Sequence, residues 1–143
     1  MENNIQRFYI CRMEANVPEY RFANSEEYFS WMLKYYALCL DRRMPSKKDI
    51  IFLLGVLSAK QQGIVPNTRN KLFTDYFLSL GWHHPNIHTY RDRCLTDKWI
   101  RISKEGNFDF NDNIIIPLPS AEGFLVNFKI IVDNPEPAMK LDL

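Results

Sequence analysis

The stretch from Leu72 to Ile102 constrains the fold most, because it has the order helix, glycine turn, helix and strand. Apolar residues recur at helical spacing up to Gly81, and a second periodic segment begins near Pro85 and ends near Lys98. The apolar positions are Leu72, Phe73, Tyr76, Phe77 and Leu80 in the first helix, and Ile87, Tyr90, Cys94 and Leu95 in the second. Residues 99–103 have the composition of a strand. This order predicts a small fold that mixes helices with a sheet.

A β-hairpin is predicted directly after the second helix. Residues 104–107 form a polar turn that contains a glycine, and Phe108, Phe110 and residues 114–116 supply the returning strand. The helix from Leu72 to Leu80 is expected to be capped by Asn67 or Thr68.

Two further helices are predicted on the N-terminal side. The first has Asn24 or Ser25 as its N-cap and ends at the basic residues 42–43, and the second begins after Pro45 with Ser46 as its cap and ends at Gly63. The first carries an aromatic stripe of Tyr28, Trp31, Tyr35 and Tyr36. This stripe fits a core or helix interface better than a stacking platform, and the helix from Tyr28 to Leu40 could also supply a homodimer contact.

Strands are expected at both ends of the chain. The N-terminal one covers residues 5–13, followed by a turn at residues 16–19 and a short strand at residues 20–22. After a linker at residues 117–123, apolar and polar residues alternate over residues 124–132, which predicts one strand that pairs with the N-terminal strand. The proline-containing residues 134–143 are expected to form a surface arm.

The composition favours an ordinary folded protein in a reducing compartment. The chain has 143 residues with 46% hydrophobic content, which suits one domain. Its three cysteines, Cys11, Cys39 and Cys94, are far apart and form no CxxC motif. The sequence shows neither a signal peptide nor a long apolar run, so we expect a soluble cytoplasmic protein without membrane contact.

The net charge of +1 hides an uneven distribution along the chain. Residues 42–104 carry twelve Lys/Arg against four Asp/Glu, a net charge of +8, whereas residues 1–41 carry −2 and residues 105–143 carry −5. The basic segment contains the two helices and the strand described first. This coincidence indicates a basic patch, although basic residues that merely solvate helix surfaces would give the same count.

The second helix of the opening stretch carries the candidate binding residues. Opposite its apolar seam we expect Asn86, Thr89, Arg93 and Thr96, with His88 and Asp92 beside them. Such side chains can bind base edges or phosphates, and the helix start near Pro85 offers free N–H groups. Contacts to adjacent phosphates are expected from Lys98, Arg101, Lys104, Thr68, Arg69 and Lys71. Asp92 would weaken such contacts unless it accepts from cytosine or pairs with Arg91.

With these elements, residues 46–117 resemble the winged helix-turn-helix superfamily, and residues 93–102 look like the end of a recognition helix that passes into a wing strand. The resemblance implies DNA contacts at Asn86, His88, Thr89 and Arg93. The expected fold class is α+β, in a single domain of residues 1–143. It has an N-terminal strand and helix extension (1–44), a winged-helix core (45–117), a C-terminal strand (118–133) that joins an accessory sheet, and a tail (134–143).

Catalytic and metal-binding functions find little support. The sequence has no Gly-rich phosphate loop, GxSxG or HExxH motif, so we expect no enzyme, no cofactor and no small-molecule substrate. His83, His84, His88 and Cys94 are metal-ligating residue types, but their spacing matches no closed zinc site. Cys94 fits a buried position in the apolar seam better than a nucleophile.

Two functions remain open. The first is a non-catalytic protein that binds double-stranded DNA in a regulatory or architectural role, such as transcription regulation. The second is a structural or assembly protein of a multiprotein particle, such as a phage-like viral particle. In this case an exposed Trp82 with His83 and His84 docks onto a protein partner.

Overall fold

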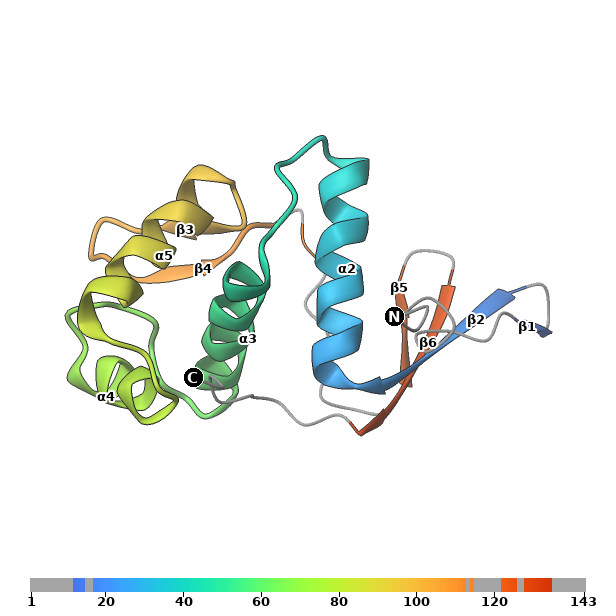
Figure 1. Cartoon of the computed structure of the whole chain (residues 1–143), viewed down its shortest axis with the longest axis horizontal. Coiled ribbons are helices and arrows are strands. Elements are labelled where there is room, and N and C mark those ends of the chain that lie inside the picture. The colour runs from blue at the N-terminus through green and yellow to red at the C-terminus, as the bar shows by residue number, and fades with distance from the viewer. Residues whose placement is uncertain (1–11, 15–16, 113, 115–121, 126–127, 135–143) are drawn as a thin grey trace.

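The computed structural model of the chain describes residues 12–14, 17–112, 114, 122–125 and 128–134. Over these residues the fold is α+β. The helices are α2 (Ser25–Cys39), α3 (Lys47–Gln61), α4 (Lys71–Ser79) and α5 (His84–Thr96). The strands are β1 (Arg12–Glu14), β2 (Val17–Asn24), β3 (Ile100–Ile102), β4 (Phe108–Phe110), β5 (Glu122–Leu125) and β6 (Phe128–Asn134). In Figure 1, α2 stands between the sheet of β1, β2, β5 and β6 and the group formed by α3, α4, α5 and the β3–β4 hairpin.

Side-chain caps define the first residues of three helices. Asn24 accepts a hydrogen bond from the Glu27 amide at 2.9 Å at the start of α2. At the start of α3, Ser46 and Asp49 each accept from the other's backbone amide, which is a reciprocal capping box. The cap of α4 is Asn70, whose side chain accepts from the Leu72 amide at 3.2 Å. The prediction of Asn67 or Thr68 as that cap is wrong, because the cap lies three residues after Asn67 and two after Thr68.

The four helices of the described residues end in the same backbone motif. The residue after each C-cap has a positive φ, and the next amide donates back to a carbonyl of the last helical turn, as in Ile64 to Ala59 and Trp82 to Phe77. Glycine occupies this left-handed position after α3 and α4, at Gly63 and Gly81. After α2 and α5 the position is held by Asp41, with φ 54°, and Lys98, with φ 67°. A side chain with Cβ in this conformation costs about 1 kcal/mol relative to glycine.

The motif after α4 determines where Trp82 lies. Its indole ring packs against Phe77 at 5.9 Å and Phe52 at 5.6 Å between ring centroids, and only 2% of the residue is exposed. The prediction of an exposed Trp82 is therefore wrong. The residue that follows a left-handed glycine in this motif commonly makes an apolar contact back to the helix, and a tryptophan there is drawn into the core.

The predicted hairpin is present as β3 and β4. The two strands are antiparallel, with Ile100 opposite Phe110 and Ile102 opposite Phe108. The turn between them contains Gly106 at φ 90°. The amide of Phe108 also donates to the carbonyl of Pro66 at 2.9 Å, which joins β4 to the connection between α3 and α4. Residues 115–116 of the predicted returning strand lie outside the described residues.

The larger sheet of the described residues has the strand order β1-β2-β6-β5. Strands β2 and β6 are parallel, with Tyr20 opposite Ile130 and Phe22 opposite Val132. The N-terminal and C-terminal parts of the chain thus share a sheet, as expected, but the predicted partner is wrong. The strand beside β6 is β2, and β1, which includes the described part of the predicted N-terminal strand, pairs with β2 instead. The predicted turn at residues 16–19 is wrong, because Val17–Glu19 belong to β2. Most of the predicted strand at residues 5–13, the linker at residues 117–121 and the arm beyond residue 134 lie outside the described residues.

The expected single strand over residues 124–132 is in fact part of a hairpin. Strands β5 and β6 are antiparallel, with Leu125 opposite Phe128. Phe124 is opposite Lys129, so position 124 belongs to the other face of the sheet from positions 128 and 130. The alternating pattern, which would place all three positions on one face of a single strand, is therefore interrupted by the change of direction.

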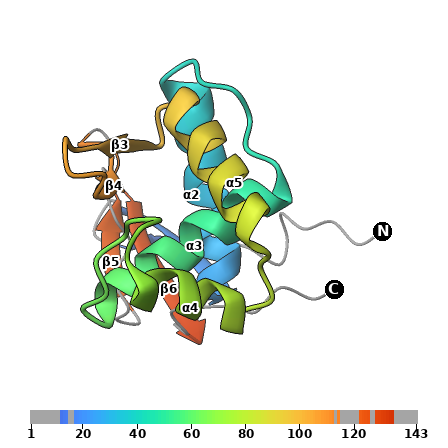
Figure 2. The ribbon, with the colours of Figure 1, turned by 90° about the vertical axis from the view of Figure 1, so that its left-hand side faces the viewer.

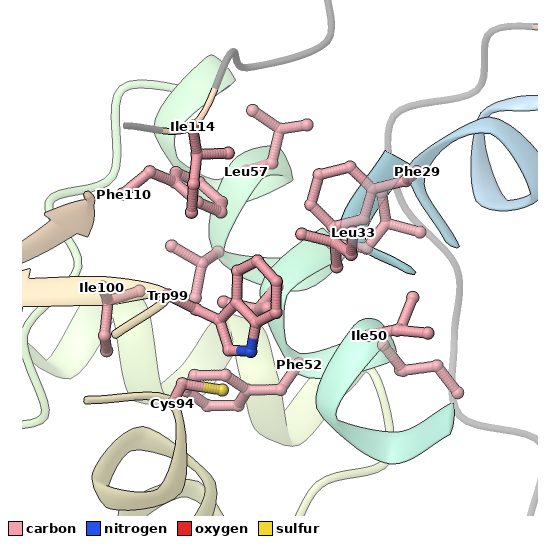
Figure 3. Close-up of a cluster of buried hydrophobic side chains, with 14 of the residues drawn as sticks. Phe29, Leu33, Ile50, Phe52, Leu57, Cys94, Trp99, Ile100, Phe110 and Ile114 are labelled. Carbon is pink, nitrogen blue, oxygen red and sulfur yellow. The ribbon is translucent and has the colours of Figure 1, made fainter. Parts of the chain in front are cut away.

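Trp99 lies at the centre of the core. It is fully buried among side chains from α2, α3, α5 and the hairpin (Figure 3), including Phe29, Phe52, Cys94 and Phe110. The aromatic stripe of α2 packs against β2: Tyr28 and Tyr36 are buried, and Trp31 stacks on Tyr35 and contacts Tyr20 at 5.6 Å. The interpretation of this stripe as core is confirmed. Among the described helices, none combines the length and apolar character needed to span a membrane.

Candidate nucleic-acid interface

Helix α5 buries one side and exposes the other, as its sequence predicts. Ile87 and Cys94 are fully buried, whereas His88, Thr89 and Asp92 are exposed. Burial raises the pKa of the Cys94 thiol far above its ordinary value, so this cysteine is a protonated core residue. The outer side of α5 therefore offers an imidazole, a hydroxyl and a carboxylate to solvent. Asn86 is half-buried at the first turn.

Arg91 connects this outer side to the segment before α4. Its Nη1 donates to Oγ1 of Thr68 at 3.0 Å, and its Nη2 lies 2.8 Å from Oδ1 of Asp92. The pairing of Asp92 with Arg91, which the sequence left open, is thus present. This pair partly neutralises the one acidic side chain that faces outward from the middle of α5. The hydrogen bond from Arg91 to Thr68 holds the segment before α4 beside the helix.

Asn67 connects the same segment to the turn of the β3–β4 hairpin. Its Nδ2 donates to the Glu105 carbonyl at 3.1 Å and to Oδ1 of Asn107 at 2.8 Å. A Cβ added to Gly106 would lie 3.3 Å from this nitrogen, so glycine allows the close approach. The turn that carries Lys104 is therefore held next to residues 67–69.

These contacts assemble three predicted segments on one side of the molecule, which we call the α5 face. Figure 2 shows α4, α5 and the hairpin together on that side. The α5 face consists of His88, Thr89 and Asp92 from α5, Thr68 and Arg69 from the α3–α4 connection, and Lys104 from the hairpin turn. Arg69 and Lys104 are exposed, and neither has a carboxylate within 4.0 Å among the described residues.

Arg93 does not belong to the α5 face, and the prediction that it faces outward is wrong. Its Nε and Nη2 donate to the two carboxylate oxygens of Asp49 in α3 at 3.1 and 3.0 Å. Asp49 is 1% exposed. Burial alone would raise the pKa of Asp49, but hydrogen bonds from Arg93 and Ser46 hold it below its ordinary value. Arg93 therefore compensates a buried charge and joins α5 to α3.

Of the remaining predicted phosphate contacts, two are paired with carboxylates and one lies at the end of α5. Lys71 pairs with Asp75 one turn along α4 at 2.7 Å, and Arg101 pairs with Asp112 and donates to the Phe110 carbonyl. Lys98 instead lies at the C-terminal end of α5 in the left-handed conformation described above. The structure thus brings together only part of the predicted set. The organising roles of Arg91 and Asn67 were missed, because both depend on partners distant in the sequence.

The described residues contain no group of three or more His, Cys, Asp or Glu side chains arranged to hold a metal ion. Comparison with protein-family models, curated proteins and solved structures finds no match in any of the three.

Proposed function

We propose that residues 46–114 form a winged helix-turn-helix and that the protein binds double-stranded DNA through the α5 face without catalysing a reaction. The order of three helices and a hairpin supports this proposal. So does the hydrogen bond from Phe108 to Pro66, which attaches the hairpin to the segment between the first two of these helices.

The observation that carries the proposal is the pair of links from Arg91 to Thr68 and from Asn67 to the hairpin turn. They hold a helix, a connection and a turn in fixed relative positions. A surface of this kind can follow a groove and its flanking backbone at the same time.

The side chains of the α5 face divide into two roles in this proposal. His88 and Thr89 lie on the exposed side of the helix and would contact base edges. Arg69 and Lys104 flank the helix and would contact phosphates, which set the position and most of the salt dependence.

Fluorescence anisotropy of a labelled duplex, measured over a salt series, tests the proposal. Arg69→Ala and Lys104→Ala should each weaken binding, and each should reduce the slope of log affinity against log salt by about one. Lys34→Ala is the matched control, because Lys34 is an exposed cation on α2. An absence of duplex binding at low salt would refute the proposal. So would a double variant that keeps the affinity and salt slope of the wild type.

Assembly with a protein partner is the second candidate function. The observation that favours it is the exposure of Leu72, 68% exposed at the start of α4, with Leu78 exposed on the same helix. Exposed leucines on a short helix suit an apolar contact. In that case sedimentation would show self-association or a stoichiometric complex without nucleic acid, and Leu72→Ser would weaken it.

A further inference from the structure

A hollow of about 380 Å³ lies where α2 and α5 end, at the top of the molecule in Figure 1. It is formed by the loop after α2 and the last residues of α5. The lining residues are Leu40, Asp41, Arg42, Arg43, Thr96, Asp97 and Lys98. It lies outside the α5 face as defined above.

Three cations line this hollow, and two carboxylates accompany them. Among the described residues, no carboxylate lies within 4.0 Å of Arg42, Arg43 or Lys98. The negative ends of the two helices are already partly compensated, because the amides of Arg42 and Trp99 donate to carbonyls of their last turns. The three cations outnumber the two carboxylates, Asp41 and Asp97, so the lining carries a net charge of +1.

Arg42 has an unmet requirement for an acceptor. Its guanidinium carbon lies 5.2 Å from the centroid of the Trp99 ring. Its Nη1 is shielded from solvent and has no hydrogen-bond partner among the described residues. Burial accordingly lowers the pKa of Arg42. A shielded cationic donor of this kind is stabilised by an anionic oxygen.

The backbone provides an independent observation. Asp41 and Lys98 are the two non-glycine residues with positive φ in the described part of the chain, and both line this hollow. The helices that end elsewhere have glycine at the same position of the motif. Charged side chains therefore occupy both positions in a conformation that favours glycine, and such backbone strain is found often at functional positions.

We propose that this hollow binds a phosphate group, through Arg42, Arg43 and Lys98. The guanidinium groups supply directed donors and Lys98 supplies a point charge, as phosphate sites require. The phosphate belongs either to a small molecule or to a nucleic-acid backbone. Binding of free phosphate does not depend on the proposed DNA-binding function.

Titration of the ¹⁵N-labelled full chain with inorganic phosphate, followed by two-dimensional NMR, tests the proposal. Saturable shifts are expected for the Trp99 indole N–H and the Lys98 amide, and sodium chloride of equal ionic strength should not reproduce them. Lys98→Gly and Asp41→Gly provide a matched pair, because glycine suits both positions and both variants should fold. Lys98→Gly should weaken phosphate binding about tenfold, and Asp41→Gly should strengthen it.

Shifts that rise linearly with phosphate, without saturation, would overturn the proposal. Equal phosphate affinity of both variants and the wild type would also overturn it, because the cations would then serve only the helix ends. Duplex binding measured on the same variants shows whether the bound phosphate belongs to a small molecule or to a nucleic-acid backbone. If Lys98→Gly lowers the salt slope of duplex binding, the site holds a backbone phosphate; if duplex binding is unchanged or absent while phosphate still saturates, the ligand is a small phosphorylated molecule.

Discussion

Replacing Arg93 with alanine should destabilise the protein by about 2–3 kcal/mol at neutral pH. The change removes both hydrogen bonds to the carboxylate of Asp49, at 3.0 and 3.1 Å, and leaves that buried charge without its cation. Loss of one partner from a buried pair costs about 3–5 kcal/mol, and solvent screening at Arg93, whose side chain is 32% exposed, reduces this figure. The bonds from Ser46 to Asp49 remain.

Urea denaturation followed by tryptophan fluorescence measures this loss, because Trp99 is fully buried. Arg91→Ala is the matched control on the same helix. Its carboxylate partner Asp92 is exposed, and its other partner is the uncharged hydroxyl of Thr68, so the cost should be about 1 kcal/mol. A deficit for Arg93→Ala no larger than that of the control would refute the reasoning.

The pH dependence supplies a second check on the same pair. The pKa of Asp49 is lowered in the folded protein, so its contribution is present above the unfolded pKa and is lost as pH falls through the folded pKa. In Arg93→Ala, protonation of Asp49 removes its negative charge and so removes the cost of burying that charge without its cation. The difference in unfolding free energy between wild type and variant should therefore shrink as pH falls below about 4. A difference that stays constant from neutral to acidic pH would contradict the assignment.

Three further predictions follow from the structure. Gly55→Ala should destabilise the protein by about 1 kcal/mol or more despite its better helix propensity, because the new Cβ would lie 2.8 Å from Cζ of Phe77; unfolding experiments that show a gain would contradict this. Asp41→Gly should stabilise it by about 0.4–1 kcal/mol, since φ there is 54°, and an unchanged melting temperature would argue against strain at this residue. Iodoacetamide should label the exposed Cys39 in the folded protein but label the buried Cys94 only in urea, as peptide mapping would show; rapid labelling of Cys94 without urea would contradict its burial.

The helices were predictable because local signals determine them. Apolar periodicity, the caps Asn24 and Ser46, and the glycines at positions 63 and 81 all lie within or next to the helix that they define. The burial of Trp82 was predictable in principle from the same motif, since the residue after its left-handed glycine packs back onto the helix. The sequence did not indicate which residue each polar side chain would contact in the folded protein.

Arg93 illustrates that limit. On a helix with 100° per residue, position 93 lies about a quarter of a turn from the apolar seam, so it belongs to the border between the two sides. A long side chain at the border turns toward whichever neighbour stabilises it. Here the neighbour is Asp49, 44 residues earlier in the chain, and only the packing of α5 against α3 brings it within reach.

The same limit changes the electrostatic argument for DNA binding. Within residues 42–104, all of which the structure describes, five of the twelve Lys/Arg side chains pair with carboxylates. The net charge of +8 over this segment therefore overstates the field at the α5 face, where Arg69 and Lys104 are the cations without such a pair. Each neutralised phosphate contributes about 0.9 to the salt slope, so two contacts predict a slope near −2. A much steeper slope would mean that further cations, such as those at the hollow between α2 and α5, also reach the backbone.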